Sequence, residues 1–305
     1  MRSVQSVLVE MMLKTLSNKR NFSDEKRLHK FMEQKRIEHT QPYVLPETLR
    51  TKYNISKKQY DGMDCYIFNE NHPAAHHHIL YLHGGAYISQ PKPQHWSFLA
   101  SIADQTKSTI FVPIYPKAPN HQYTESFAKV MPIYKEIIQT AGSERTILMG
   151  DSAGGGFALA LAELLLEEHI PQPKHLILLS PWLDITLQNP DALALEPEDP
   201  MLSLYGLIEI GKTYAGDTDR EFYLLSPING KLEGLTDISL FIGTHEVFLP
   251  DARRFKQLAE AAQVPLNYFE YPKMSHVFPL QPIPEAKQAT RQIIDIINNG
   301  SAPLS

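Results

Sequence analysis

Apolar and polar residues alternate with helical spacing near the start of the chain. Six apolar residues at this spacing predict an amphipathic helix: Val4, Val7, Leu8, Met11, Met12 and Leu16. The segment Asn21–Lys26 then offers a turn with a Ser or Asp helix cap, and helical spacing resumes until about His39. Two helices are therefore expected before the first strand.

A different pattern begins after Pro42 and Pro46, which end the helical region. The alternating segments Leu49–Ile55 and Met63–Phe68 are predicted to form an antiparallel pair of strands. Short, wholly apolar runs follow, as is typical of parallel strands buried on both faces. These strands are expected at Ile79–Leu82, Ser108–Pro113, Thr146–Gly150, Leu176–Ser180, Ile238–Gly243 and Leu266–Tyr271.

Helical segments separate the apolar runs. They are expected at about His95–Gln105, Ser126–Thr140, Gly155–Glu168, Pro250–Ala262 and Pro284–Asn298. The alternation predicts an α/β fold with a mostly parallel central sheet and helices on both faces. Only residues 184–219 break it, with three prolines before the apolar helical run Leu202–Tyr214. We expect this insertion to cover the carboxyl ends of the strands, where open α/β sheets bind ligands.

Length and composition indicate one globular domain over residues 1–305. Hydrophobic residues make up 43% and charged residues 21% of the chain, which excludes disordered and fibrous classes. The net charge is -5 and no long Lys/Arg run occurs, so nucleic acid is not an expected partner.

The first residues need separate attention because Arg2 precedes an apolar stretch, as in a signal peptide. Gln5 and Glu10 interrupt that stretch, and no small-residue cleavage site follows. No segment approaches the ~18 uninterrupted apolar residues of a membrane span. Cys65 is the only cysteine, so no internal disulfide can form and a reducing compartment is expected. Together these features predict a cytoplasmic protein with no membrane span.

Ser152 is the candidate nucleophile of a serine hydrolase. It lies in the run Gly150–Gly154, Gly-Asp-Ser-Ala-Gly, between an expected strand and an expected helix. A serine on such a sharp turn projects into the crevice, and the flanking glycines avoid collisions with neighbouring chain. The five-residue pattern is weak by itself, since glycine-rich turns also serve only to pack a helix on a sheet. Its position between strand and helix makes it specific.

Three backbone N–H groups are candidate donors to the oxyanion of an ester under attack. Gly84 and Gly85 end an earlier strand, where the lack of side chains allows close approach to a substrate oxygen. Ala153 directly follows the nucleophile. Loss of one such donor typically raises the barrier by ~2.7–4 kcal/mol. His83 is expected to brace this loop rather than to transfer protons.

A serine hydroxyl needs a base to take its proton, and the base needs a carboxylate to orient it. His276 follows the last apolar strand, where a loop residue reaches the crevice, and is the candidate base. Glu246 follows the preceding strand and is the candidate acid, which gives the chain order Ser152, Glu246, His276. Asp251 is the alternative acid, although its place after Pro250 is explained by helix capping.

Other features have more than one interpretation. Tyr87 and Trp182 are candidate substrate-binding residues, but the sequence does not decide whether Trp182, like Tyr205, lines an acyl pocket or fills the core. The run His76–His78 suggests a metal cluster, yet neighbouring strand residues point to opposite faces and no carboxylate stands beside them. A solvated strand entry is the better interpretation, and no metal or cofactor is expected.

Four motifs in order resemble the hormone-sensitive lipase family of α/β hydrolases, notably its bacterial esterases. His83–Ala86 resembles the oxyanion motif of the family, and Gly150–Gly155 its nucleophile motif. Tyr115–His121 is similar to the segment Tyr-Arg-Leu-Ala-Pro-Glu-His, and Ser180–Asp184 to another recurrent segment. The chain departs from the family in two places: Glu246 stands where most members carry Asp, and Pro-Lys replaces Arg-Leu in the third motif.

The resemblance implies an α/β-hydrolase fold whose helical cap is built from residues 1–45 and 184–219. It also implies that the protein hydrolyses small, short-acyl esters, so its expected partner is a small-molecule ester substrate. Two alternatives stay open: cleavage of amides or formamides by the same site, and a non-catalytic small-molecule binder on the same scaffold. The physiological substrate does not follow from the sequence. Nor does the oligomeric state, for which a homo-oligomer is one of the options.

Overall fold

A computed structural model describes residues 2–73 and 75–300, so Met1, Ala74 and residues 301–305 of the predicted domain lie outside the described residues. The described part contains an eight-stranded sheet with the order β1-β2-β4-β3-β5-β6-β7-β8. The strands are β1 Ile55–Tyr60, β2 Met63–Phe68, β3 His78–Leu82, β4 Thr109–Pro113, β5 Thr146–Asp151, β6 His175–Leu179, β7 Asp237–His245 and β8 Leu266–Ser275. Strands β3 to β8 are mutually parallel, and all six predicted runs are confirmed within a few residues.

The antiparallel pair at the edge of the sheet is confirmed, but one of its strands was placed wrongly. β1 pairs antiparallel with β2, in the register Ile55 to Phe68 and Tyr60 to Met63. Most of the segment Leu49–Ile55, predicted as a strand, belongs instead to helix α3 (Glu47–Tyr53). Asn54, in the left-handed conformation with φ 49°, ends that helix one residue before the strand begins.

Helices cover both faces of the sheet, as predicted. The longer ones are α1 Val4–Leu16, α2 Glu25–Glu38, α4 Pro93–Thr106, α5 Tyr123–Ala141, α6 Ala153–Glu167, α8 Leu204–Ala215, α9 Leu249–Ala261 and α10 Pro284–Asn299; the short α7 is Pro190–Leu195. Alternate residues of one strand enter different cores. Leu80 and Leu82 belong to the core that also contains residues of α5, α6 and α9, whereas Ile79 and Tyr81 belong to the core with α4 and α10.

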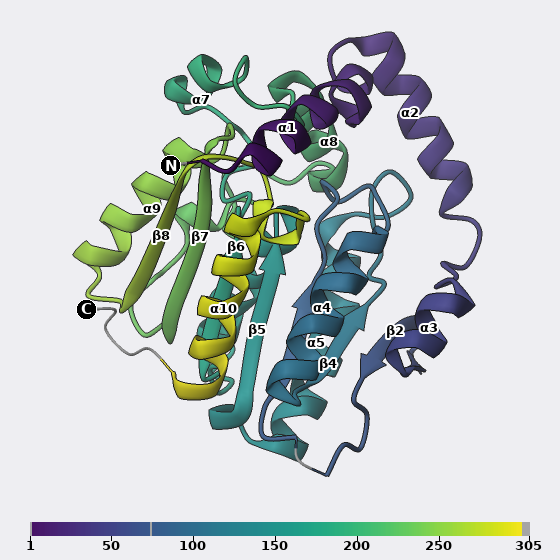
Figure 1. The fold of residues 1–305 in the computed structure, drawn as a ribbon, viewed down its shortest axis with the longest axis vertical. Helices are drawn as coiled ribbons and strands as arrows, with labels where there is room; N and C mark the ends of the chain where they lie inside the picture. The colour runs from purple at the N-terminus through teal and green to yellow at the C-terminus, as the bar shows by residue number, and fades with distance from the viewer. Residues whose placement is uncertain (1, 74, 301–305) are drawn as a thin grey trace.

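The two segments outside this layered body lie above the carboxyl ends of the strands. Figure 1 shows α1 crossing the top of the molecule in front of α8, with α7 beside it. Residues from both segments, including Leu13 and Met201, line one cavity. This arrangement brings the start of the chain and the insertion together over the sheet edge at which β5 ends.

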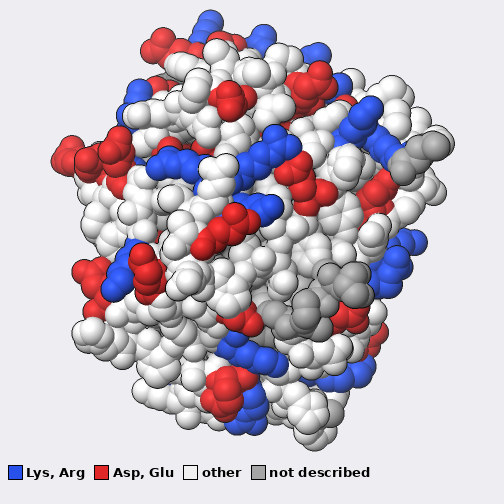
Figure 2. All heavy atoms as spheres, turned by 90° about the vertical axis from the view of Figure 1, so that its left-hand side faces the viewer, with Lys and Arg blue, Asp and Glu red and all other residues white. Residues whose placement is uncertain are grey.

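The surface charge is mixed on the face that carries α9 and β8. Lys/Arg and Asp/Glu side chains are interspersed there, and neither sign of charge forms a large patch of its own (Figure 2). The pair Arg253–Glu270, with 2.6 Å between Nη2 and Oε1, is one example from these two elements. Within the described ranges, no helix combines the length and the apolar character needed to cross a membrane.

Candidate active site

Ser152 occupies a strained turn between β5 and α6. Its φ and ψ are 53° and -125°, a backbone conformation that residues other than glycine rarely adopt. This conformation raises the hydroxyl above the end of the strand. The turn is so tight that a Cβ on Gly154 would lie 2.0 Å from the carbonyl oxygen of Leu82. Glycine is therefore required at this position for the helix to approach β3.

An unbroken chain of hydrogen bonds joins the three residues predicted as nucleophile, base and acid. His276 Nε2 lies 2.9 Å from Ser152 Oγ, and His276 Nδ1 lies 2.7 Å from Glu246 Oε2. The strand–loop junctions after β5, β7 and β8 supply these side chains, which are 7%, 0% and 3% exposed for Ser152, Glu246 and His276. The geometry is that of a nucleophile, a general base and its orienting carboxylate.

The carboxylate of Glu246 is held from both sides. Oε2 faces His276, while Oε1 accepts bonds of 2.8 Å from Ser180 Oγ and from the N–H of Gly243. The alternative acid, Asp251, is bonded instead to Asn189 Nδ2 at 2.9 Å. The structure thus brings Glu246, and not Asp251, to the histidine.

The electrostatic surroundings favour the protonated form of the base. Burial lowers the pKa of His276, but the hydrogen bond and negative charge of Glu246, with smaller contributions from Asp199 and Asp151, outweigh burial and raise it above the usual 6.5. An imidazole in this setting readily takes the proton of an attacking hydroxyl.

The predicted oxyanion loop is in place, but Gly84 is not free to serve as a donor. Its N–H already donates to Asp151 Oδ1 at 2.8 Å, so this prediction is wrong. The N–H groups of Gly85 and Ala153 have no hydrogen-bond partner among the described residues. The loop adjoins Ser152 in the same cavity, as does Ala86, whose N–H is likewise unengaged there.

Asp151 holds this loop in position and was missed by the sequence analysis. Besides the Gly84 N–H, its carboxylate accepts a bond from Tyr81 Oη at 2.6 Å and lies 3.3 Å from His95 Nε2. These contacts keep the pKa of Asp151 lowered although burial alone would raise it. His83 stacks on Tyr115 with 4.5 Å between ring centroids, in agreement with its expected bracing role.

Comparison with known proteins agrees with this geometry. Residues 79–280 match a protein family described by the alpha/beta hydrolase fold. The chain belongs to this α/β hydrolase family. An esterase of Acinetobacter venetianus is 31% identical over 221 residues, which cover 71% of this chain and 73% of that one.

Solved structures agree with the family and with its hormone-sensitive lipase branch. A Staphylococcus aureus protein assigned as an esterase superposes with a TM-score of 0.88 at 34% identity, covering 92% of this chain and 95% of that one. A hormone-sensitive lipase from a metagenome library gives a TM-score of 0.76 at 27% identity, covering 89% and 97%. The predictions of fold, of family and of an esterase-type enzyme are therefore confirmed.

The hydrolase has a cavity of about 270 Å³ at Ser152. Ser152 and His276 lie in its wall with the oxyanion loop. The opposite wall is apolar and comes from the two segments above the sheet, with the side chains Leu13, Leu16, Phe22, Met201 and Leu202. An ester bound here would have its carbonyl at the polar wall and its acyl or alkyl group against the apolar one.

Tyr87 and Trp182, predicted to bind substrate, do not line this cavity. Both are almost fully buried, at 1% and 0% exposed. The Tyr87 ring stacks between Tyr214 and Trp182, with 4.1 and 5.7 Å between ring centroids. Trp182 continues the stack to Phe248, with 5.8 Å between centroids. The two predicted residues form part of the core of the α/β hydrolase.

Asp199 is a further residue that sequence analysis missed. Its Oδ1 accepts the N–H groups of Met201 and Leu202, at 2.8 and 2.9 Å, and its Oδ2 accepts the N–H of Val247 at 3.1 Å. It therefore joins the insertion to the residue next to Glu246. Burial raises the pKa of Asp199 to about 6, against the lowering effect of His276. Asp199 precedes Glu246 by 47 positions in the sequence, so no local pattern could have indicated that the two lie close together.

Proposed function

We propose that this α/β hydrolase cleaves small, short-acyl carboxylic esters through an acyl-enzyme intermediate on Ser152. The observation that carries the proposal is the hydrogen-bond chain from Ser152 Oγ through His276 to Glu246. Hydrolase relatives named as esterases support the ester as the bond that is cleaved. No step of the proposed reaction requires a metal or cofactor.

The first half of the reaction forms the acyl-enzyme. Ser152 Oγ attacks the ester carbonyl while His276 Nε2 takes its proton, and Glu246 stabilises the imidazolium. We infer that the unengaged N–H groups of Gly85 and Ala153, together with that of Ala86, stabilise the tetrahedral oxyanion. His276 then passes the proton to the departing alkoxide, which leaves as the alcohol.

The second half repeats these steps with water. His276 removes a proton from a water molecule as it attacks the acyl carbonyl, and the collapse of the second tetrahedral intermediate returns the proton to Ser152. The carboxylic acid leaves and the enzyme is restored.

We further propose that residues 1–45 and 184–219 act as a cap that limits acyl length. Support comes from Leu13, Leu16 and Met201, which close the apolar side of a cavity of about 270 Å³. A space of this size suits a short acyl group and leaves little room for a long extended chain. The cytoplasmic location stays a prediction from the sequence features given above.

Turnover of p-nitrophenyl esters with acyl chains of two to twelve carbons tests the proposal. We expect the highest kcat/KM for the shortest chains, and Ser152→Ala to lower kcat by about 10⁴-fold or more. Equal turnover by wild type and Ser152→Ala would overturn the assignment, and activity only on long chains would overturn the short-acyl preference.

The two alternatives are separated by parallel measurements. A fluorophosphonate labels a serine that has a working base, so labelling of wild type and not of Ser152→Ala excludes a pure binder. Turnover of p-nitroacetanilide beside p-nitrophenyl acetate measures the preference for amides. A higher kcat/KM for the anilide would assign the site to amide hydrolysis.

A further inference from the structure

Helix α1 is oriented opposite to an ordinary amphipathic helix. The six apolar residues whose spacing predicted it are exposed, by 42 to 76%, and they are Val4, Val7, Leu8, Met11, Met12 and Leu16. Its buried side chains are polar, namely Ser6 and Glu10. Among the described residues, eleven large hydrophobic side chains are exposed, and six of them lie on this helix. Such a concentration marks a binding surface rather than scattered exposure.

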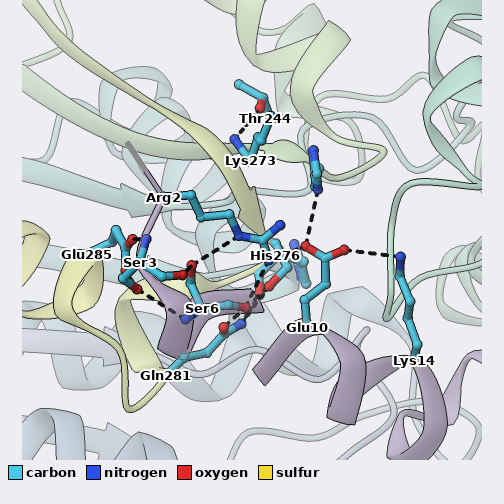
Figure 3. A network of polar contacts seen from close by, with 12 residues as sticks. Arg2, Ser3, Ser6, Glu10, Lys14, Thr244, Lys273, His276, Gln281 and Glu285 are labelled. Carbon is cyan, nitrogen blue, oxygen red and sulfur yellow. Dashed lines mark hydrogen bonds and ion pairs between the residues drawn. The ribbon is translucent and has the colours of Figure 1, made fainter. Parts of the chain in front are cut away.

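Polar contacts pin the inner face of α1. Glu10 is bonded to Arg2 and Lys14, and lies 3.2 Å from Nδ1 of His245, the neighbour of Glu246 (Figure 3). At the start of the helix, about two turns before Glu10, the backbone N–H and hydroxyl of the N-cap Ser3 donate to the Glu285 carboxylate at 2.6 and 2.8 Å. Rotation of the helix to bury its apolar face would break these contacts and turn Glu10 away from His245. The apolar face is therefore fixed outward.

The same part of the chain carries a positive charge. Residues 1–38 contain nine Lys/Arg and five Asp/Glu, a net charge of +4, whereas the whole chain has -5. Several of these cations, including Lys14, Arg20 and Arg27, are exposed near the ends of α1 and on the adjacent α2. Lys14 and Arg27 also pair with Glu10 and Asp24. An apolar helix face beside basic side chains is complementary to an anionic lipid surface.

We propose that α1 binds the surface of an anionic lipid bilayer, with its apolar face at the boundary between headgroups and acyl chains. The helix lies in the plane of the surface and does not cross it, and Lys14 and Arg20 lie at headgroup level. A second copy of the chain fits this face less well, since two-fold pairing of α1 would bring two segments of charge +4 together.

The position of α1 connects this surface to the cavity. Leu16 belongs to the exposed apolar face and also lines the cavity that contains Ser152. An enzyme seated on the bilayer by α1 would have an apolar path from the lipid to the nucleophile. This part of the inference rests on the proposed function. It narrows the substrates of the proposed esterase to esters that are dissolved in a lipid surface or attached to it.

Vesicle co-sedimentation of the full chain tests the lipid surface directly. The probes are vesicles of phosphatidylcholine alone and of phosphatidylcholine with one third phosphatidylglycerol. We expect binding to the mixed vesicles, about tenfold weaker binding to the neutral ones, and loss of most binding in 0.5 M NaCl. Val7→Asp/Met11→Asp should lower binding to mixed vesicles at least about tenfold, because it places two charges in the apolar face.

A matched control changes two even more exposed apolar residues outside α1, Ile37 and Val44 (67% and 76% exposed, against 42% and 55% for Val7 and Met11), and Ile37→Asp/Val44→Asp should bind like wild type. Turnover of p-nitrophenyl acetate, unchanged in both double variants, verifies folding, because none of these residues lines the cavity. Absence of binding by wild type, or an equal loss in the control, would overturn the proposal. A concentration-dependent dimer that Val7→Asp/Met11→Asp dissociates, without vesicle binding, would assign the face to a second copy. Vesicle binding is read without any turnover, so failure of the proposed esterase reaction is distinguishable from failure of this inference.

Discussion

The Ser180 hydroxyl donates a hydrogen bond of 2.8 Å to Glu246 Oε1. The same oxygen of Ser180 accepts the N–H of Val277, the residue after His276, at 3.0 Å. One buried hydroxyl at the end of β6 therefore holds both the loop of the acid and the loop of the base. Ser180 is a positioning residue, since it acts on Ser152 only through these two partners.

Removal of this hydroxyl should misalign the acid and the base. Ser180→Ala leaves Glu246 with one of its two Oε1 donors and frees the Val277 N–H, so we expect kcat for p-nitrophenyl acetate to fall by about tenfold with little change in KM. Ser239→Ala is the matched control, because Ser239 is also fully buried but bonds to His175 Nε2 at 2.9 Å, away from the nucleophile. Equal loss in the two variants would show that Ser180 acts only on stability.

The raised pKa of His276 predicts where activity is lost in acid. The base accepts a proton only in its neutral form, so kcat/KM should fall as the pH drops through the pKa of His276, with an inflection above the usual 6.5. Asp199→Asn removes one of the negative charges that raise this pKa, and should move the inflection to lower pH. A pH profile of kcat/KM for both proteins checks the shift. An inflection well below 6.5 in wild type would contradict the prediction.

Two carboxylates near the site should respond differently to an isosteric change. Glu246→Gln removes the charge that stabilises the imidazolium, and we expect kcat to fall by up to about 10⁴-fold. Asp251→Asn should stay within about threefold of wild type, because Asp251 bonds to Asn189 and not to His276. Turnover of p-nitrophenyl acetate by the two variants measures the difference. A large loss in Asp251→Asn alone would reassign the acid.

Asp251 should instead limit stability at neutral pH. Burial raises its pKa from 3.8 to about 6, and its Oδ2 has no hydrogen-bond partner among the described residues. The folded state therefore holds a proton that the unfolded state releases between about pH 4 and 6, so this group costs stability as the pH rises through that range. Asp251→Asn should raise the free energy of unfolding at pH 7.5 relative to pH 4 by on the order of 2 kcal/mol. Urea unfolding at the two pH values measures it, and an equal change at both would contradict the titration of Asp251 as the cause.

The parallel strands could be predicted because each is a continuous apolar run. The alternation rule, by contrast, failed at Leu49–Ile55, where apolar and polar residues alternate by chance largely within the seven-residue helix α3 and the left-handed Asn54 decides the boundary. Ser152, Glu246 and His276 could be placed since each follows a strand, and parallel strands end at one edge of the sheet.

Other parts of the site depend on contacts that no local pattern records. Gly84 has the residue type of an oxyanion donor, but whether its N–H is free depends on Asp151, 67 positions away. Tyr87 and Trp182 each follow a strand, as expected, yet their rings stack on one another in the core and do not line the cavity. The exposed face of α1 was predicted as an amphipathic stripe, while its direction depends on ionic contacts to β7 and α10.

The bonds of Asp199 have a consequence for the order of events in one catalytic cycle. The same carboxylate holds Met201 and Leu202, in the wall of the cavity, and Val247, beside Glu246. A displacement of that wall large enough to admit a bulky ester would pull on the loop that orients His276. A substrate that leaves this wall in place therefore also leaves the loop of Glu246 in place, so one carboxylate couples the width of the cavity to the alignment of His276.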